Sequence, residues 1–116
     1  MTIDRTPAHL SDMLAFVREL RALVGGATLE AYRGQRVLNH AVEKLFINLG
    51  EAAMRVPEAD RARLGNVPWR QIIGLRNILA HGYEQVDHET LYRTVTTELA
   101  AVEGSLADHL AKRGDA

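Results

Sequence analysis

The sequence comprises 116 residues with a mass of 12.9 kDa, which predicts one compact domain spanning residues 1–116. Apolar residues make up 47% and charged residues 25%, as in ordinary globular proteins, and the lack of cysteine excludes disulfides, thiolate metal sites and cysteine nucleophiles. The formal net charge of −1 gives no overall attraction to nucleic acid, although the basic side chains are twelve arginines and only two lysines.

The first amphipathic stripe predicts a helix over residues 7–24. Apolar residues recur there every three or four positions, so one stripe of the helix faces a core. Thr6 and Pro7 provide an N-cap and a first-turn signal, and Gly25 with Gly26 is a typical stop.

A second and denser apolar stripe covers residues 37–56 and ends before Pro57, which predicts the most buried helix of the protein. Short helical turns are expected on either side of this helix, at residues 28–33 and 58–64, and a glycine then breaks the chain. These turns would connect the main helices.

Pro68 opens a third predicted helix, which has an apolar side and ends near Gly82. Asp87 is expected to cap a fourth, continuous helix, whose apolar residues step by three or four as far as Leu110. Residues 110–116 are expected to be a frayed tail. Because no strand-length alternation and no hairpin turn occurs, the predicted fold is all-α, an antiparallel four-helix up-and-down bundle with short extra helical turns.

The sequence also predicts where the protein resides and what it does not bind. Charges within the first twenty residues exclude both a signal-peptide core and a membrane span there, and no later window is long and apolar enough. Together with the absence of cysteine, this predicts a cytoplasmic protein without membrane association. No histidine follows a glutamate by three positions, and zinc, phosphate-loop and nucleophile-elbow motifs are absent, so we expect no metal and no cofactor.

A polar cluster interrupts the apolar third helix and consists of Arg76, Asn77, His81 and Tyr83. Asn77 and His81 are four positions apart and share a helix face, whereas Arg76 and His81 lie about 140° apart on an ideal helix. Either the long arginine side chain reaches round the helix, or the helix bends at Gly82. By spacing alone, the cluster is more typical of a solvated helix end with a half-buried tyrosine.

The remaining histidines and the tryptophan are interpreted as structural or surface residues. His40 is expected to be a polar core or interface group near Glu43. Trp69 is expected to be a packing anchor and not a platform for stacking bases. Three histidines are interpreted as exposed surface residues: His9, His88 and His109.

The segment 68–83, PWRQIIGLRNILAHGY, followed by Val86 and Asp87, resembles the signature segment of the HepT-like branch of the HEPN-domain proteins. The upstream stretch INLGEAA at residues 47–53 is similar to the second helix of that family. The resemblance therefore covers about residues 8–105, almost the whole domain.

The core pattern of that family is an arginine, four residues, a histidine, one residue and a tyrosine, which Arg76, His81 and Tyr83 match without gaps. The resemblance implies a small all-helical RNase toxin of a type VII toxin–antitoxin pair. It also implies a homodimer and a neighbouring nucleotidyltransferase antitoxin of the MntA kind, which neutralises the toxin. Tyr83 matches the tyrosine to which that antitoxin transfers AMP.

The chemistry of these residues is compatible with RNA cleavage that needs no metal. Imidazole titrates near working pH, so His81 can accept or donate the proton that cleavage moves. Arg76 can stabilise the negative charge that gathers on the phosphorane, and Asn77 is a supporting residue that would hold the imidazole or bind a phosphate oxygen. AMP on Tyr83 would add an anionic group two residues from His81, compete for the arginine and block RNA.

A single histidine serves poorly as both base and acid at one scissile bond. A two-fold homodimer that brings two copies of the third helix together would supply a second His81 and a second Arg76 to one cleft. The paired arginines would make that cleft basic although the total charge is balanced. We therefore expect a homodimer on mechanistic grounds as well.

Two other functions are compatible with the sequence. The first is a non-catalytic accessory subunit that binds substrate for a nucleotidyltransferase, for which expression without the neighbouring protein would be harmless. The second is a structural dimerisation bundle, for which Arg76→Ala and His81→Ala would change stability at most. Growth arrest that His81→Ala abolishes while the fold stays intact would distinguish the toxin from both.

Overall fold

The computed structural model describes residues 3–82 and 87–113, and this part of the chain is helical with no strand. The predicted all-α class is confirmed. The helices described are α1 (Thr6–Val24), α2 (Leu29–Gly34), α3 (Arg36–Met54), α4 (Glu58–Arg63), α5 (Trp69–His81), α6 (His88–Thr97) and α7 (Leu99–Lys112).

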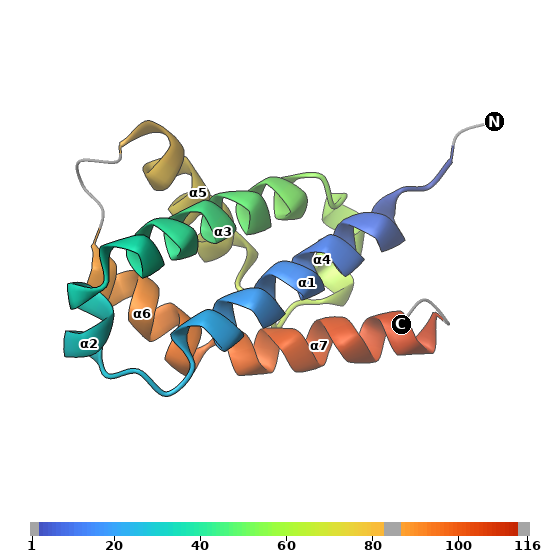
Figure 1. The fold of residues 1–116 in the computed structure, drawn as a ribbon. Coiled ribbons are helices and arrows are strands. Elements are labelled where there is room, and N and C mark those ends of the chain that lie inside the picture. The colour runs from blue at the N-terminus through green and yellow to red at the C-terminus, as the bar shows by residue number, and fades with distance from the viewer. Residues whose placement is uncertain (1–2, 83–86, 114–116) are drawn as a thin grey trace.

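Four main helical segments run alternately in opposite directions, namely α1, α3, α5 and the pair α6 and α7 (Figure 1). Helix α1 packs against both α3 and α7, and α5 packs mainly against α3. The short helices α2 and α4 lie where the connecting turns were expected. The arrangement is thus the predicted antiparallel helical bundle, and it places α5 at the outside of α3.

The core is built from the apolar stripes that the sequence predicts, except for Val37 and for Ile78 of the third stripe, which is 46% exposed. Val37 was expected in the second stripe but is 83% exposed, because it lies nine positions from Phe46 and therefore on the opposite face of α3. The largest fully buried side chains of the three longest helices are Leu10, Met13, Val17 and Leu20 in α1, Phe46 and Leu49 in α3, and Leu99, Leu106 and Leu110 in α7.

The ends of α1 show how far local signals specify a helix. Thr6 is not the N-cap, since the helix begins at this residue and its backbone N–H donates to the Asp4 side chain at 3.0 Å. Gly25 ends the helix as predicted, with a φ of 53° that disfavours any residue with a side chain.

The predicted continuous fourth helix is wrong, because the chain departs from regular helix at Glu98, where φ is −119°. Threonine hydroxyls compete there with the helical hydrogen bonds, and such back-bonding bends helices. The hydroxyls donate to carbonyls one turn earlier: Thr94 to Thr90 at 2.8 Å, Thr96 to Tyr92 at 3.0 Å and Thr97 to Arg93 at 2.6 Å. The tail prediction also needs correction, since α7 continues to Lys112 and Leu110 is buried.

The predicted cap at Asp87 is confirmed and fixes the start of α6 after the segment that follows α5. Its carboxylate accepts from the backbone N–H of Glu89 at 3.0 Å and of Thr90 at 3.4 Å, and from the Thr90 hydroxyl at 2.8 Å. The hydrogen bond from the Thr90 hydroxyl is the first of the contacts that lower the pKa of Asp87 below its usual value.

No helix in the described ranges is long and apolar enough to cross a membrane. Within the same ranges, no three histidine, aspartate or glutamate side chains are grouped so that they could hold a metal ion.

Candidate active site on helix α5

Helix α5 carries three of the predicted site residues, Arg76, Asn77 and His81, and is helical through His81. Gly82 ends the helix, and its N–H donates to the carbonyl of Ile78 at 2.6 Å. Because this end lies beyond His81, it does not change the angle between Arg76 and His81. Of the two arrangements that the spacing left open, the bend is not seen before His81, and the guanidinium turns to the adjacent residue, with Arg76 Nη1 donating to Asn77 Oδ1 at 3.0 Å.

The stem of Arg76 lies directly on Gly50 of α3. A Cβ atom added at Gly50 would overlap Arg76 Cβ, and it would lie 2.8 Å from Arg76 Cγ and 3.2 Å from the Ile72 carbonyl oxygen. The two helices therefore cross at a distance that only glycine permits at this position. Gly50 was not among the predicted site residues, because a glycine within a helical stripe does not tell which neighbour approaches it.

The guanidinium of Arg76 is partly withdrawn from solvent and incompletely paired. The Arg76 side chain is 22% exposed, and Nη2 is 3.9 Å from Glu51 Oε1, longer than a hydrogen bond. Its Nε is buried and has no hydrogen-bond partner among the described residues. A partly desolvated cation with a free donor can bind an anionic oxygen more strongly than a fully solvated one.

Asn77 and His81 lie on the outward side of α5, and both are exposed. Asn77 also lines a hollow of about 630 Å³ between α4 and α5, together with Arg70 and Gly74. His81 makes no hydrogen bond or ion pair with the described residues, and none joins it to Arg76. The structure thus joins Arg76 to Asn77 and places His81 on the face of Asn77. Tyr83 lies outside the described residues.

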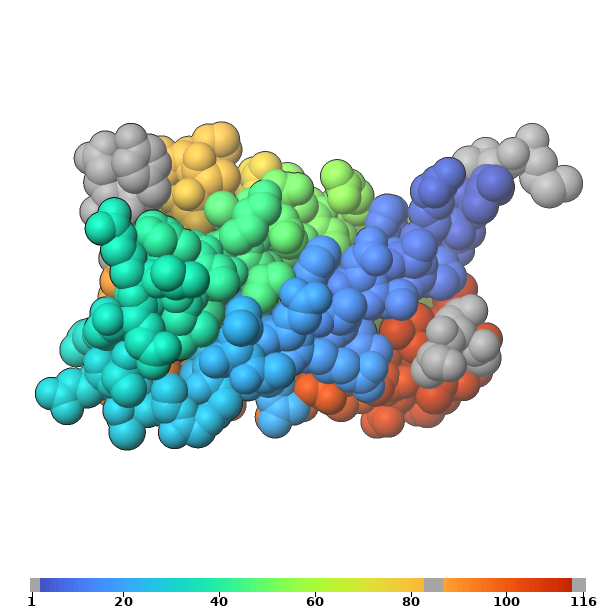
Figure 2. All heavy atoms as spheres, viewed as in Figure 1, coloured from blue at the N-terminus to red at the C-terminus, as the bar shows by residue number. Residues whose placement is uncertain are grey.

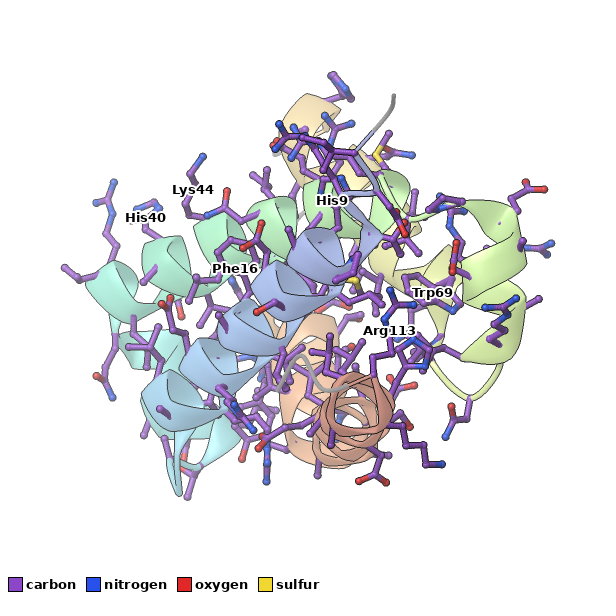
Figure 3. All side chains as sticks on the ribbon, turned by 90° about the vertical axis from the view of Figure 1, so that its right-hand side faces the viewer. His9, Phe16, His40, Lys44, Trp69 and Arg113 are labelled. Carbon is purple, nitrogen blue, oxygen red and sulfur yellow. The ribbon has the colours of Figure 1, made fainter. Side chains whose placement is uncertain are left out.

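Histidines elsewhere are placed differently from the prediction. His40 is exposed and points away from the body of the protein with Lys44 (Figure 3), so it is not a core group. His88, expected at the surface, is the histidine near Glu43, with 4.0 Å between Nδ1 and Oε2. It meets the ring of buried Tyr32 edge-on at 6.3 Å between centroids. Burial and, second, Glu43 raise the pKa of Tyr32 to about 12.

Trp69 is the packing anchor that the sequence predicts. Its indole Nε1 donates to the carbonyl of Leu64 at 3.0 Å, and the guanidinium of Arg61 lies over its ring at 5.9 Å from the centroid. Arg61 in turn donates to the carbonyls of Val56 and Met54 at the end of α3. These contacts fix the start of α5, and with it the position of Arg76 along α3.

A family model described as Ribonuclease HepT-like matches residues 13–108. The chain is 28% identical over 109 residues to "Putative RNase TTE0752" of Caldanaerobacter subterraneus subsp. tengcongensis, covering 93% of this chain and 97% of that protein. It is 26% identical over 95 residues to "Putative RNase MJ1380" of Methanocaldococcus jannaschii, covering 82% and 87%. It is 23% identical over 96 residues to "Probable ribonuclease HepT" of Thermococcus cleftensis, covering 83% and 87%. No solved structure matches the chain.

Proposed function

The chain belongs to the HepT-like ribonuclease family, and from this membership we propose that it is a metal-independent ribonuclease with Arg76 and His81 as catalytic residues. The observation that carries the proposal is the arrangement on α5, where an incompletely paired Arg76 is hydrogen-bonded to Asn77 and an accessible imidazole lies one turn beyond Asn77. Asn77 is the supporting residue, because it orients the guanidinium.

The proposed reaction uses the RNA's own 2′-hydroxyl as the nucleophile. The 2′ oxygen forms a bond to the adjacent phosphorus while the bond from phosphorus to the 5′ oxygen of the next nucleotide breaks. An imidazole takes the proton of the 2′-hydroxyl, and an imidazolium gives a proton to the departing 5′ oxygen. Arg76 donates hydrogen bonds to the phosphorane oxygens, where negative charge accumulates in the transition state.

The two proton transfers are assigned to a symmetric homodimer that contributes one His81 from each chain. The proposal is supported by the outer side of α5, which is left uncovered because this helix packs mainly against α3. Ile78 on this helix is 46% exposed and would offer an apolar contact to a second chain.

Chelation of divalent metal is the first test of this function. We expect the purified chain to cleave a labelled single-stranded RNA at the same rate with and without an excess of EDTA, because the proposed acid, base and charge stabiliser are all side chains. Gel analysis of the products over time measures the rate. Cleavage that stops in EDTA and returns with magnesium would contradict the mechanism, and a chain that cleaves no RNA would contradict the function.

We further propose that the ribonuclease is a cytoplasmic toxin whose antitoxin is a nucleotidyltransferase of the MntA kind that transfers AMP to Tyr83. The physical support is the position of Tyr83, two residues after His81, where an added phosphodiester would repel RNA and compete for Arg76. Coexpression with the transferase should give a mass increase confined to the peptide that contains Tyr83. Tyr83→Phe should lack this increase and remain toxic. A neutralised toxin without modification would contradict the proposal.

A further inference from the structure

We propose that single-stranded RNA reaches Arg76 along an arginine track, which we define as Arg76, Arg55, Arg5 and His9. The track runs from Arg76 on α5 past Arg55 at the end of α3 to the start of α1. The proposal rests on the proposed function, since it names the surface that holds the substrate of that same site.

Two hollows that share Arg55 form the track. Each hollow has a volume of about 390 Å³. The first is lined by Glu51, Met54, Arg55 and Arg76. The second is lined by Ile3, Asp4, Arg5, Thr6, His9, Arg55 and Pro57. Because Arg55 lines both, the two hollows adjoin at this side chain, one on the side of the candidate catalytic arginine and the other at the N-terminal end of α1.

The end of α3, which is followed by Arg55, and the start of α1, with Arg5 and His9, are adjacent on one face of the molecule. Figure 2 shows the start of α1 beside the end of α3. Figure 3 faces this end of the protein and labels His9 on α1 there. His9 is half-buried, whereas Arg5 and Arg55 are exposed and able to contact a ligand.

The arginines of the track are less fully paired with carboxylates than four arginines elsewhere in the fold. Arg18 and Arg21 of α1 pair with Glu103 at 3.3 and 2.6 Å. The hydrogen bond from Arg21 is the first cause of the lowered pKa of Glu103. Arg33 and Arg93 both pair with Glu89 at 2.9 Å. These four cations are compensated within the fold, and the pairs of Arg18, Arg21 and Arg33 join different helices.

By contrast, Arg5 and Arg55 form no ion pair within the described residues, and Arg76 is 3.9 Å from its nearest carboxylate. Of the two acids that line the hollows, Asp4 is engaged by the backbone N–H of Thr6, a contact that lowers its pKa. Asp4 therefore stays ionised, and the two hollows hold three guanidinium groups against two carboxylates, a local excess of positive charge on a protein whose total charge is −1. An excess of free guanidinium groups attracts phosphates.

The shape of the track favours a single strand over a duplex. The cations follow a line of two hollows, whereas A-form RNA is bound across a wide minor groove by a broad surface. A single strand can place its phosphates along the line and its exposed bases against guanidinium and imidazole planes. It can also adopt the in-line geometry that the 2′-hydroxyl needs for attack, which a rigid duplex resists.

The test measures RNA binding as a function of salt in a His81→Ala background, which prevents cleavage during the measurement. Fluorescence anisotropy of a labelled oligouridine gives the association constant at each salt concentration. Arg5→Ala with Arg55→Ala should reduce the slope of log K against log salt by about 1.4, that is about 0.7 for each lost phosphate contact on a single strand. Affinity at moderate salt should fall about tenfold.

The matched control is Arg36→Ala with Arg63→Ala, which removes the same charge from two exposed arginines that line neither hollow. Its slope should equal that of the parent protein, and thermal melting should show both double variants folded. An equal loss in both pairs, or no loss in the track pair, overturns the track. Tighter binding of a duplex than of the single strand overturns it as well.

The same experiment separates the track from the function on which it rests. Cleavage is measured apart from binding, with His81 intact. If the protein cleaves RNA but the track variants bind normally, the track is wrong and the function stands. If the track variants lose binding although the intact protein cleaves nothing, the function is wrong and the binding surface stands.

Discussion

Replacing His81 with alanine is expected to lower the rate of RNA cleavage by a factor of about 10²–10⁴, the usual contribution of a general acid or base. The imidazole is exposed and makes no hydrogen bond or ion pair with the described residues, so its removal takes nothing from the core. The loss should therefore appear in activity and not in stability. Single-turnover cleavage of a labelled RNA and a thermal melt measure the two quantities side by side.

His40→Ala is the control for this prediction. His40 is also exposed and also on a helix, but it points away from the body of the protein on α3. Its removal should change neither rate nor melting temperature. A His81→Ala protein that cleaves at the normal rate would remove the imidazole from the mechanism. An equal loss on replacing His40 would mean that the effect is not specific to α5.

Gly50→Ala is expected to destabilise the protein, because a Cβ atom added at Gly50 would lie closer than 3.0 Å to other atoms. The new Cβ atom would overlap Arg76 Cβ and lie 3.2 Å from the Ile72 carbonyl oxygen, and neither belongs to a flexible chain end. The two helices must then separate, at a cost of about 1–3 kcal/mol for overpacking of this kind. The melting temperature should fall by several degrees, and cleavage should fall with it, because Arg76 shifts relative to Asn77 and His81.

Gly104→Ala is the matched control, since Gly104 lies within α7 and a Cβ atom there would meet nothing within 4 Å. This replacement should raise stability by about 0.5–1 kcal/mol, the helical advantage of alanine over glycine, and leave cleavage unchanged. The two variants make the same chemical change with opposite expected signs. A Gly50→Ala protein as stable and active as the parent would show that the close crossing of α3 and α5 is not needed.

The sequence predicts the main helices well because their signals are local. The start of α5 beside Pro68, the stop at Gly25 and the cap at Asp87 each depend on a few neighbouring residues, and the structure confirms them. The break at Glu98 was missed although its cause is in the sequence, a run of threonines whose hydroxyls turn back on the helix. Apolar periodicity continued across the break and outweighed that signal.

Contacts between helices could not be predicted in the same way. Helical periodicity gives the angle between Arg76 and His81 around the helix axis. It does not predict the hydrogen bond from Arg76 to Asn77 that turns the guanidinium. Gly50 lies under Arg76 because α3 and α5 cross at that point. The sequence of either helix alone does not predict where they cross. The histidine near Glu43 was missed for the same reason. The sequence suggested His40, three positions before Glu43, whereas the structure places His88 there, which comes from α6, far along the chain.

The one-sided packing of α5 has a consequence for how the protein loses activity. Helix α1 is clasped between α3 and α7, whereas α5 packs mainly against α3 and is otherwise held by the hydrogen bonds of Gln71 to Thr94 and Glu98, so we expect α5 to be the first helix to open. Such partial opening would separate Arg76 from the residues of α3 that support it. Heat or denaturant would then inactivate the molecule before it melts, and whatever covers the outer side of α5 would protect both this helix and its chemistry.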